Sequence, residues 1–258
     1  MHDAGQINRE EKRVVKTLFE WRSRSWYGMT QILPYLYLGG LRDANDVEQL
    51  KEKQITHVVS IHELSGRVGG TLKDLNILRI HMADLPEANI NEHFAETATF
   101  IHRARLAKKS VLVHCVAGVS RSVCIVAAYL IVACDMSYAA ALAYIVNKRP
   151  CANPNFGFRM QLAEYAGKRS LSDGKMMRNQ FDSEAFDELK ANDRKLLLLD
   201  YPAASLSNAS NESGVFNNTK SPSSNTSIKK ECIDYVECQD NTASRSIFND
   251  ANISFIDQ

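Results

Sequence analysis

The sequence predicts an α/β fold, in which a single domain carries a central, mostly parallel β-sheet flanked by helices and is followed by a disordered C-terminal tail. Short apolar runs suited to strands alternate with longer segments of helical periodicity between residues 29 and 168. Strands that alternate with helices are typical of a parallel sheet covered on both faces. Beyond this region the composition shifts to Ser and Asn, and the apolar periodicity is lost.

The expected elements follow in order along the chain. Apolar runs predict strands at LYLGG (36–40), THVVSIH (56–62), LNILRIHM (75–82) and SVLVH (110–114). Helical spacing predicts helices over 43–54, 91–108, 121–134, 137–149 and 155–166. The segment 121–134 is apolar on nearly all sides, so we expect a buried helix there. Pro150 and Pro154 mark the break between the last two helices.

The chain is expected to divide into three parts. Residues 1–28 form an N-terminal extension, whose segment 7–26 has the apolar spacing of a short amphipathic helix. Residues 29–168 form the folded domain. Residues 169–258 form a largely disordered tail, because SLSNASNESGVFNNTKSPSSNTS cannot bury enough apolar surface to offset the entropy lost on ordering. Within this tail, SEAFDELKANDRKLLLLDY is expected to be an isolated helix or a site for a partner.

Composition limits the classes of partner. The 31 Lys and Arg residues against 30 Asp and Glu leave a net charge of +1, which gives no indication of a nucleic-acid partner. No apolar run approaches the ~18 residues of a membrane helix, and Met1-His2 is not the start of a myristoylated chain, so we expect no membrane anchor. The six cysteines form no C-x-x-C pair, which predicts free thiols and no metal site. We therefore expect an intracellular protein of the cytoplasm, and also of the nucleus.

The stretch SVLVHCVAGVSRS, at residues 110–122, places a cysteine between a predicted strand and a predicted helix. A tight loop at a helix N-terminus directs backbone N–H groups into one concavity, so CVAGVS has the geometry of an anion site. Gly118 allows the loop to close, and Arg121 adds a planar fork for two phosphate oxygens. The same field lowers a thiol pKa from its usual ~8.5, so we expect Cys115 to be a thiolate nucleophile directed at phosphorus.

The residues on either side of the loop support this interpretation. His114 is expected to orient the loop, and the Ser122 hydroxyl to hydrogen-bond the sulfur when it departs as a leaving group. A lone cysteine after a strand is usually a small buried hydrophobe. Here His, Cys, Gly, Arg and Ser occur together, with a strand before them and a helix after them, which favours the nucleophile.

The segment HCVAGVSRS matches H-C-x-x-G-x-x-R-[ST], the signature of the cysteine-dependent protein tyrosine phosphatases, and it most resembles the small atypical dual-specificity phosphatases. The resemblance extends over residues 29–168, where ILPYLYLGG is similar to the family's opening strand and CANPNFGFRMQL to its closing helix. It implies a dual-specificity phosphatase-like fold and a reaction through a phosphocysteine that needs no metal or other cofactor. The residues that would bind the substrate phosphate are Val116, Ala117, Gly118, Val119, Ser120 and Arg121.

A phosphatase of this type also needs a carboxylic acid that protonates the leaving oxygen. The segment HMADLPEANI offers Asp84, which lies where the family carries its general acid, with Glu87 as the rival. An Asp before a proline-containing turn is more often only a turn former, but the resemblance favours Asp84. Asn155 is similar to a position that braces the phosphate loop in relatives, and a helix N-cap explains it equally well.

The loop also bears on the substrate class. Its variable positions Val116, Ala117, Val119 and Ser120 include no lysine, whereas members that act on inositol lipids or RNA ends tend to carry extra cations there. We therefore expect phosphotyrosine and phosphoserine or phosphothreonine in proteins as substrates. The alternatives are a phosphoprotein-binding scaffold with weak activity and a phosphatase for a lipid or RNA phosphate.

The segment KRVVKTLF of the N-terminal extension is faintly similar to the docking peptides of MAP kinases. A solvated helix face is the commoner explanation of such a charge pattern. The family resemblance nevertheless suggests phosphoprotein substrates from signalling pathways, with MAP-kinase pathway proteins among the partners.

Overall fold

The computed structural model describes residues 28–64 and 74–200. The amphipathic helix expected over residues 7–26 and the Ser/Asn-rich segment of the predicted tail lie outside these ranges. Within them, no helix is both long enough and apolar enough to span a membrane.

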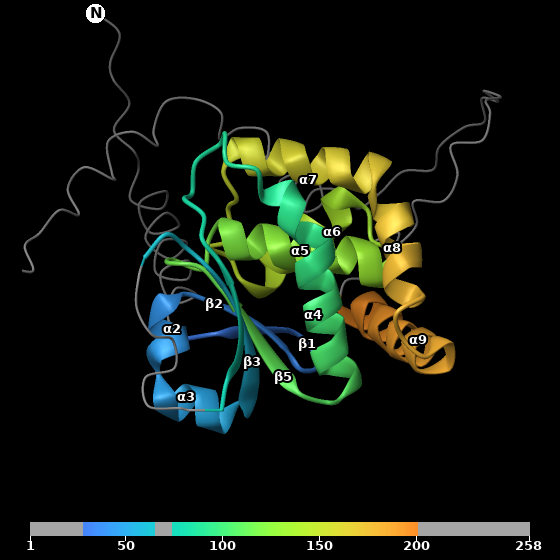
Figure 1. Cartoon of the computed structure of the whole chain (residues 1–258), viewed down its shortest axis with the longest axis horizontal. Coiled ribbons are helices and arrows are strands. Elements are labelled where there is room, and N and C mark those ends of the chain that lie inside the picture. Colours follow the sequence, from blue (N-terminus) through green and yellow to red (C-terminus); the bar gives the residue numbers. More distant parts are fainter. Residues whose placement is uncertain (1–27, 65–73, 201–258) are drawn as a thin grey trace, which may run out of the picture. The chain divides into compact units, whose positions relative to one another are not determined.

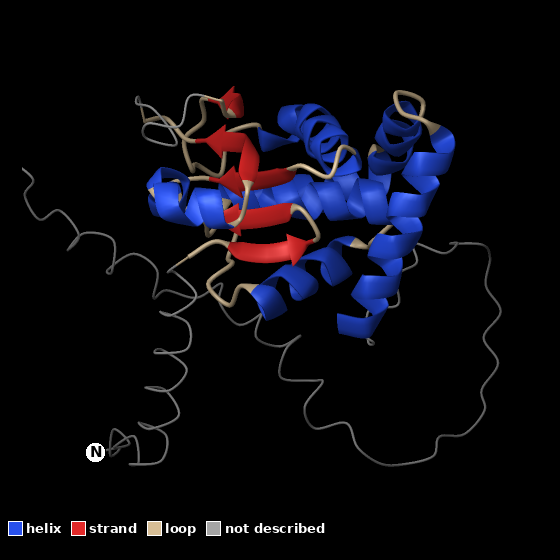
Figure 2. Ribbon diagram, turned by 90° about the horizontal axis from the view of Figure 1, so that it is seen from below, coloured by secondary structure: helices blue, strands red, loops and turns tan. Residues whose placement is uncertain are grey.

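A five-stranded sheet forms the centre of the described domain, with strand order β1-β2-β5-β3-β4 (Figures 1 and 2). Strands β2, β5, β3 and β4 run parallel, and only β1 pairs antiparallel, with β2. The strands are β1 (Thr30–Leu33), β2 (Leu36–Gly39), β3 (Ile55–Ile61), β4 (Asn76–Ile80) and β5 (Ser110–His114). The predicted mostly parallel sheet is therefore confirmed, and β1 adds an antiparallel edge strand.

Strand β5 lies in the middle of the sheet and is buried throughout its length. Val111 and Val113 belong to the larger apolar core, whereas Leu112 points to the opposite face and packs with Val58 in the smaller core. Side chains alternate between the two faces of a strand, so a strand covered on both faces needs a continuous apolar run. This is why apolar and polar residues do not alternate in SVLVH. The loop that follows β5 is therefore anchored to a buried strand.

The smaller layer on the sheet consists of α2 (Leu41–Asn45) and α3 (Val47–Glu52). The prediction of one continuous helix over residues 43–54 was wrong. Asp46 has an extended backbone and interrupts the helix, and its side chain accepts a hydrogen bond from the Gln49 N–H to cap α3. An aspartate that satisfies a free N–H in this way starts a helix rather than continuing one.

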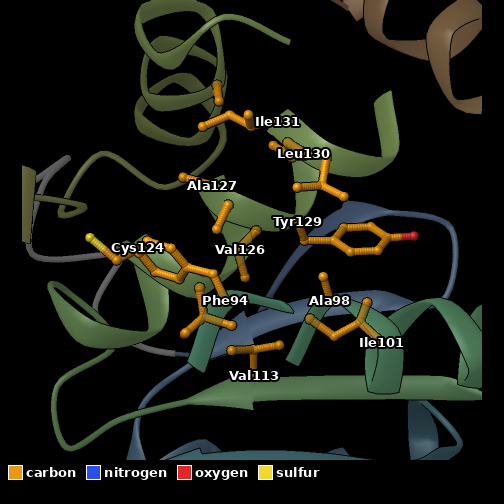
Figure 3. Close-up of a cluster of buried hydrophobic side chains, with 14 of the residues drawn as sticks. Phe94, Ala98, Ile101, Val113, Cys124, Val126, Ala127, Tyr129, Leu130 and Ile131 are labelled. Carbon is orange, nitrogen blue, oxygen red and sulfur yellow. The ribbon is translucent and has the colours of Figure 1, made fainter. Parts of the chain in front are cut away.

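The larger layer is built around α5 (Arg121–Cys134), every residue of which is buried, as predicted. Figure 3 shows apolar side chains of α4 (Phe94–Leu106) meeting Val126, Tyr129 and Leu130 of α5 above Val113 of β5. The remaining elements of this layer are the 3-10 turn η1 (Ile90–His93), α6 (Tyr138–Lys148) and α7 (Phe156–Lys168). Burying side chains of this size stabilises a fold by ~1.5–3 kcal/mol each.

The prediction that the domain ends near residue 168 was also wrong. Two further helices follow, α8 (Ser170–Arg178) and α9 (Ser183–Asp200), and Figure 1 shows both against the larger layer. Met177, Phe186 and Leu197 from these helices are buried in the main core. The folded domain therefore continues to the end of α9, and the helix expected to be isolated is part of it.

A buried ion pair explains why α9 is not an independent helix. Arg105 of α4 donates from both terminal nitrogens to the Asp193 carboxylate at 2.7 Å, and neither side chain is exposed by more than 3%. Its remaining donors bind the Pro34 carbonyl at 2.9 Å and the Tyr129 hydroxyl at 2.8 Å. Asp193 lies 88 residues from Arg105 in the sequence, so this partnership has no local sequence signal.

Candidate active site

The loop between β5 and α5 holds the predicted nucleophile. Cys115 is 1% exposed, at the end of the central strand. Its Sγ accepts a hydrogen bond from the Gly118 N–H at 3.2 Å and lies 3.2 Å from the Ser122 hydroxyl oxygen. The sulfur lies just before the N-terminus of α5, where backbone N–H groups without helical partners are available for an anion. The sulfur is therefore placed as the sequence predicted.

The backbone of this loop is held from outside by neighbouring elements. The carbonyl oxygens of Val116 and Val119 accept hydrogen bonds from the N–H groups of Leu41 and Asn153, at 3.0 and 2.8 Å. Gly118 has a φ of +70°, and a Cβ there would lie 2.6 Å from the backbone of Gly39. Both the positive φ and this close approach require glycine.

Arg149 is a further support of the loop that sequence reasoning missed. Its fully buried side chain donates from Nε to the Gly118 carbonyl at 2.9 Å. A second nitrogen donates to the Gly28 carbonyl and the Thr30 hydroxyl, both at 3.1 Å. Nothing in the sequence around Arg149 distinguishes it from a solvated arginine at a helix end, because its partners lie 31 to 121 residues away along the chain.

Arg121 is buried at the start of α5, with 4% of its surface exposed. One terminal nitrogen donates to the Glu63 carboxylate at 2.5 Å and to the Met82 carbonyl at 2.7 Å. Its Nε makes no hydrogen bond within the described residues, although the Asp84 carboxylate lies 3.5 Å away. The guanidinium is thus held at one end, and a buried donor remains for an anion.

Glu63 is the second residue that sequence reasoning missed. Its own backbone N–H, followed by the Arg121 guanidinium, holds the pKa of the Glu63 carboxyl below its ordinary value. The carboxylate is therefore charged at neutral pH and orients Arg121. A glutamate after a strand gives no indication of this role, because its partner lies 58 residues further along the chain.

Asp84 lies against the loop, as predicted for the general acid. One carboxylate oxygen accepts hydrogen bonds from the Ser120 hydroxyl and the Asn155 side-chain amide, both at 2.7 Å. The rival, Glu87, is exposed and has no hydrogen bond or ion pair with any described residue. Of the two carboxylates, only that of Asp84 contacts the loop and Arg121.

Asn155 combines the two roles that the sequence left open. Its side-chain oxygen accepts a hydrogen bond from the Phe158 N–H at 2.9 Å and caps α7. Its amide nitrogen holds Asp84, and its backbone N–H donates to the Ser120 hydroxyl at 3.1 Å. The start of α7 therefore fixes Asp84 against the loop.

His114 lies directly before the nucleophile and is fully buried. Its ring Nδ1 donates to the Cys115 carbonyl at 3.1 Å, and burial lowers the pKa of His114 to about 4. The ring is neutral at physiological pH and serves as a hydrogen-bond donor. This agrees with the expectation that His114 orients the loop.

Comparison with known proteins decides the family. Residues 36–168 match the family model described as "Dual specificity phosphatase, catalytic domain", which is more than half of the chain. The chain belongs to the dual-specificity phosphatase family.

Individual members are similar over most of the domain. The chain is 46% identical over 138 residues to mouse dual specificity protein phosphatase 22, which covers 54% of this chain and 73% of that protein. It is 43% identical over 168 residues to mouse dual specificity protein phosphatase 15, covering 65% of this chain and 68% of that protein. The crystal structure of DUSP15 has a TM-score of 0.58 at 43% identity and covers 60% of this chain and 97% of its own.

These similarities agree with the geometry of the loop. This dual-specificity phosphatase is an enzyme that hydrolyses phosphoric monoesters of phosphoproteins. The alternatives of a scaffold or of a lipid or RNA phosphatase are not favoured.

Proposed function

We propose that this dual-specificity phosphatase works through a phosphocysteine on Cys115. The Cys115 thiolate attacks phosphorus, the bond from phosphorus to the ester oxygen breaks, and Asp84 gives its proton to the departing oxygen. Water then attacks the phosphocysteine while Asp84 takes up a proton from it. The sulfur–phosphorus bond breaks, the thiolate is regenerated, and the Ser122 hydroxyl hydrogen-bonds the departing sulfur.

Phosphate binding is assigned to the loop and to Arg121. The backbone N–H groups of residues 116–121 surround the equatorial oxygens, and the Arg121 fork binds two of them. The observation that carries this proposal is the buried Nε of Arg121, which has no hydrogen bond within residues 28–64 and 74–200 and lies beside the Asp84 carboxylate. His114 and Ser120 position the loop and the acid.

The substrates proposed are phosphotyrosine and phosphoserine or phosphothreonine in signalling proteins, with MAP-kinase pathway proteins among them. The loop side chains Val116, Ala117 and Val119 carry no charge, which suits a single phosphate on a protein. We place the enzyme in the cytoplasm and the nucleus. Buried free thiols, Cys124, Cys134 and the nucleophile among them, are consistent with a reducing compartment.

The test is phosphate release at mildly acidic pH from a phosphotyrosine peptide and a phosphothreonine peptide of the same sequence. Cys115→Ser is expected to abolish turnover, and Asp84→Ala to slow it by about 10²–10⁴-fold, the usual contribution of an acid catalyst. Glu87→Ala is the matched control and is expected to retain activity. A Cys115→Ser protein with wild-type turnover would exclude the phosphocysteine mechanism.

The same assay includes a phosphoinositide and a 5′-phosphorylated RNA. Faster release from either of these than from both peptides would assign the enzyme to that other substrate class. Comparable rates on the two peptides are expected if the site accepts both kinds of phosphoester.

A further inference from the structure

We propose that an apolar platform, formed by Leu85, Phe156 and Met160, binds an apolar side chain next to the phosphorylated residue of the substrate. The inference rests on the proposed function, since it places the platform beside the acid Asp84. It goes further, because it names a feature of the substrate sequence that the enzyme selects.

One side-chain contact and one backbone contact bring the chain segments that carry Leu85 and Phe156 together. On one side, the Asp84 carboxylate accepts the hydrogen bond from the Asn155 amide at 2.7 Å. On the other side, Gly157 packs on Pro86 so closely that a Cβ would lie 2.0 Å from the Pro86 carbonyl oxygen. Leu85 and Phe156 are the residues between these contacts, and Figure 1 shows the loop before α4 reaching the start of α7.

All three side chains of the platform are exposed, although they are large and apolar. Leu85, Phe156 and Met160 are 56%, 58% and 56% exposed. Phe156 and Met160 are one helical turn apart on α7 and therefore share a face. A single exposed apolar residue needs no explanation, but a group of them beside a catalytic carboxylate indicates a binding surface.

The platform is preformed rather than assembled on binding. Gln161 of α7 donates to the Ala88 carbonyl at 2.8 Å and accepts a hydrogen bond from the Asn91 N–H at 3.2 Å. With the contact between Asp84 and Asn155, these bonds attach the acid loop to α7 at both of its ends. Little backbone entropy is then lost when a ligand binds.

The chemistry brings the substrate to this surface. To protonate the leaving oxygen, Asp84 must come within ~2.6–3.2 Å of it, and that oxygen belongs to the phosphorylated side chain itself. In phosphothreonine the ester oxygen is bonded to Cβ, and neighbouring Cα atoms are only ~3.8 Å apart, so Leu85 comes close to the residues that flank the phosphothreonine. The exposed Glu87 carboxylate on the same loop disfavours an acidic residue there. An apolar neighbour is the side chain that this surface fits.

The experiment compares phosphothreonine peptides that differ only in the residue next to the phosphothreonine, with leucine, alanine or glutamate placed on either side. For wild-type enzyme we expect kcat/KM for one leucine peptide to exceed that for its alanine partner about tenfold, equal to about 1.4 kcal/mol. The glutamate peptide is expected to be the poorest. The readout is the leucine-to-alanine ratio within each variant, so that a general change in rate cancels.

The variants are Leu85→Ser, Phe156→Ser and Met160→Ala, each of which is expected to lower the ratio to about threefold or less. Met160 lies more than a helical turn along α7 from Asn155, which contacts Asp84. Met160→Ala therefore tests the platform without disturbing the proposed acid. Leu171→Ala, at a residue of α8 that is 73% exposed, is the matched control and is expected to keep the full ratio.

Hydrolysis of para-nitrophenyl phosphate, which has no flanking residues, distinguishes a failure of the platform from a failure of the proposed function. If the enzyme hydrolyses para-nitrophenyl phosphate but has equal kcat/KM for the leucine and alanine peptides, the platform is overturned and the proposed function stands. A tenfold ratio that survives in all three platform variants would also overturn it. A folded enzyme that hydrolyses neither para-nitrophenyl phosphate nor any peptide would overturn the proposed function, and the platform with it.

Discussion

Arg105 and Arg121 are both buried in the domain, yet their hydrogen bonds differ. Every side-chain nitrogen of Arg105 donates to a protein acceptor, and its charge is balanced by a carboxylate that is as buried as itself. Arg121 pairs with carboxylates that are 46% and 31% exposed, and its buried Nε has no hydrogen bond to any described residue. The first arginine joins elements, whereas the second retains capacity for a ligand.

The difference follows from the cost of burying a charge. A buried guanidinium without acceptors is strongly destabilising, and Arg105 avoids this cost because each of its side-chain nitrogens has an acceptor. An arginine proposed to bind substrate has to leave donors free, and Arg121 does so while Glu63 and Met82 hold one end of it. The following predictions test this contrast.

The largest effect is expected at the structural pair. Asp193→Ala leaves the Arg105 charge buried without its carboxylate, and removing one partner of such a pair costs about 3–5 kcal/mol of unfolding free energy. Urea denaturation measures it. A double variant, Arg105→Met with Asp193→Leu, is expected to recover much of the loss, because it removes both charges. Equal instability of the single and double variants would contradict the account.

A slightly smaller effect, on the reaction rather than on folding, is expected at the site. Arg121→Lys keeps the charge but removes the planar fork, so kcat/KM should fall about 10²–10³-fold, or about 3–4 kcal/mol of transition-state stabilisation. The unfolding free energy should change far less than in Asp193→Ala. Arg103→Lys, at an exposed position of α4, is the matched control. A similar loss of activity in this variant would contradict the proposed role of the Arg121 fork in phosphate binding.

The next effect concerns pH and compares the histidines of the two regions. Burial lowers the pKa of His102, near α9, and of His114, before the loop, to about 4 in each case. In the unfolded chain these rings titrate near ~6.5, so between these values the unfolded chain binds protons that the folded chain does not. The unfolding free energy should therefore fall as the pH drops below about 6.5 towards 4.

Urea denaturation at pH 7.5, 6 and 5 measures this slope. His102→Leu should be less stable at pH 7.5 because it loses the contact with Tyr129, but its slope should be shallower than that of wild type. His81→Gln, at an exposed histidine, should retain the full slope. An unchanged slope in His102→Leu would contradict the role of the buried neutral ring.

The smallest effect is expected at an exposed surface pair of α7. Lys168 and Glu164 of α7 contact each other at 2.9 Å, but their side chains are 73% and 57% exposed. Water screens such pairs, so Lys168→Ala should change neither the urea midpoint nor kcat/KM beyond experimental error. A measurable loss would show that exposed ion pairs contribute more here than the contrast of the two arginines implies.

Prediction from the sequence succeeded where the determining residues are neighbours along the chain. The apolar run SVLVH, the loop and the buried helix over 121–134 were all placed correctly, because period and composition identify each of them locally. The helix over 43–54 was too long in the prediction, since the capping role of Asp46 was not recognised. The end of the domain was misplaced because the buried partners of α9 lie on α4 and α5, far away in the sequence.

The sequence by itself determined the geometry of the loop around Cys115, because Cys115, Gly118 and Arg121 lie on one strand, one turn and one helix that follow each other directly. It also limited the proposed acid to Asp84 or Glu87. Only the tertiary structure decided which partners hold these groups. Glu63 and Asn155 reach them from distant segments, and α9 docks through Asp193. The physical reason is that a hydrogen bond depends on distance in space, which local sequence patterns do not specify.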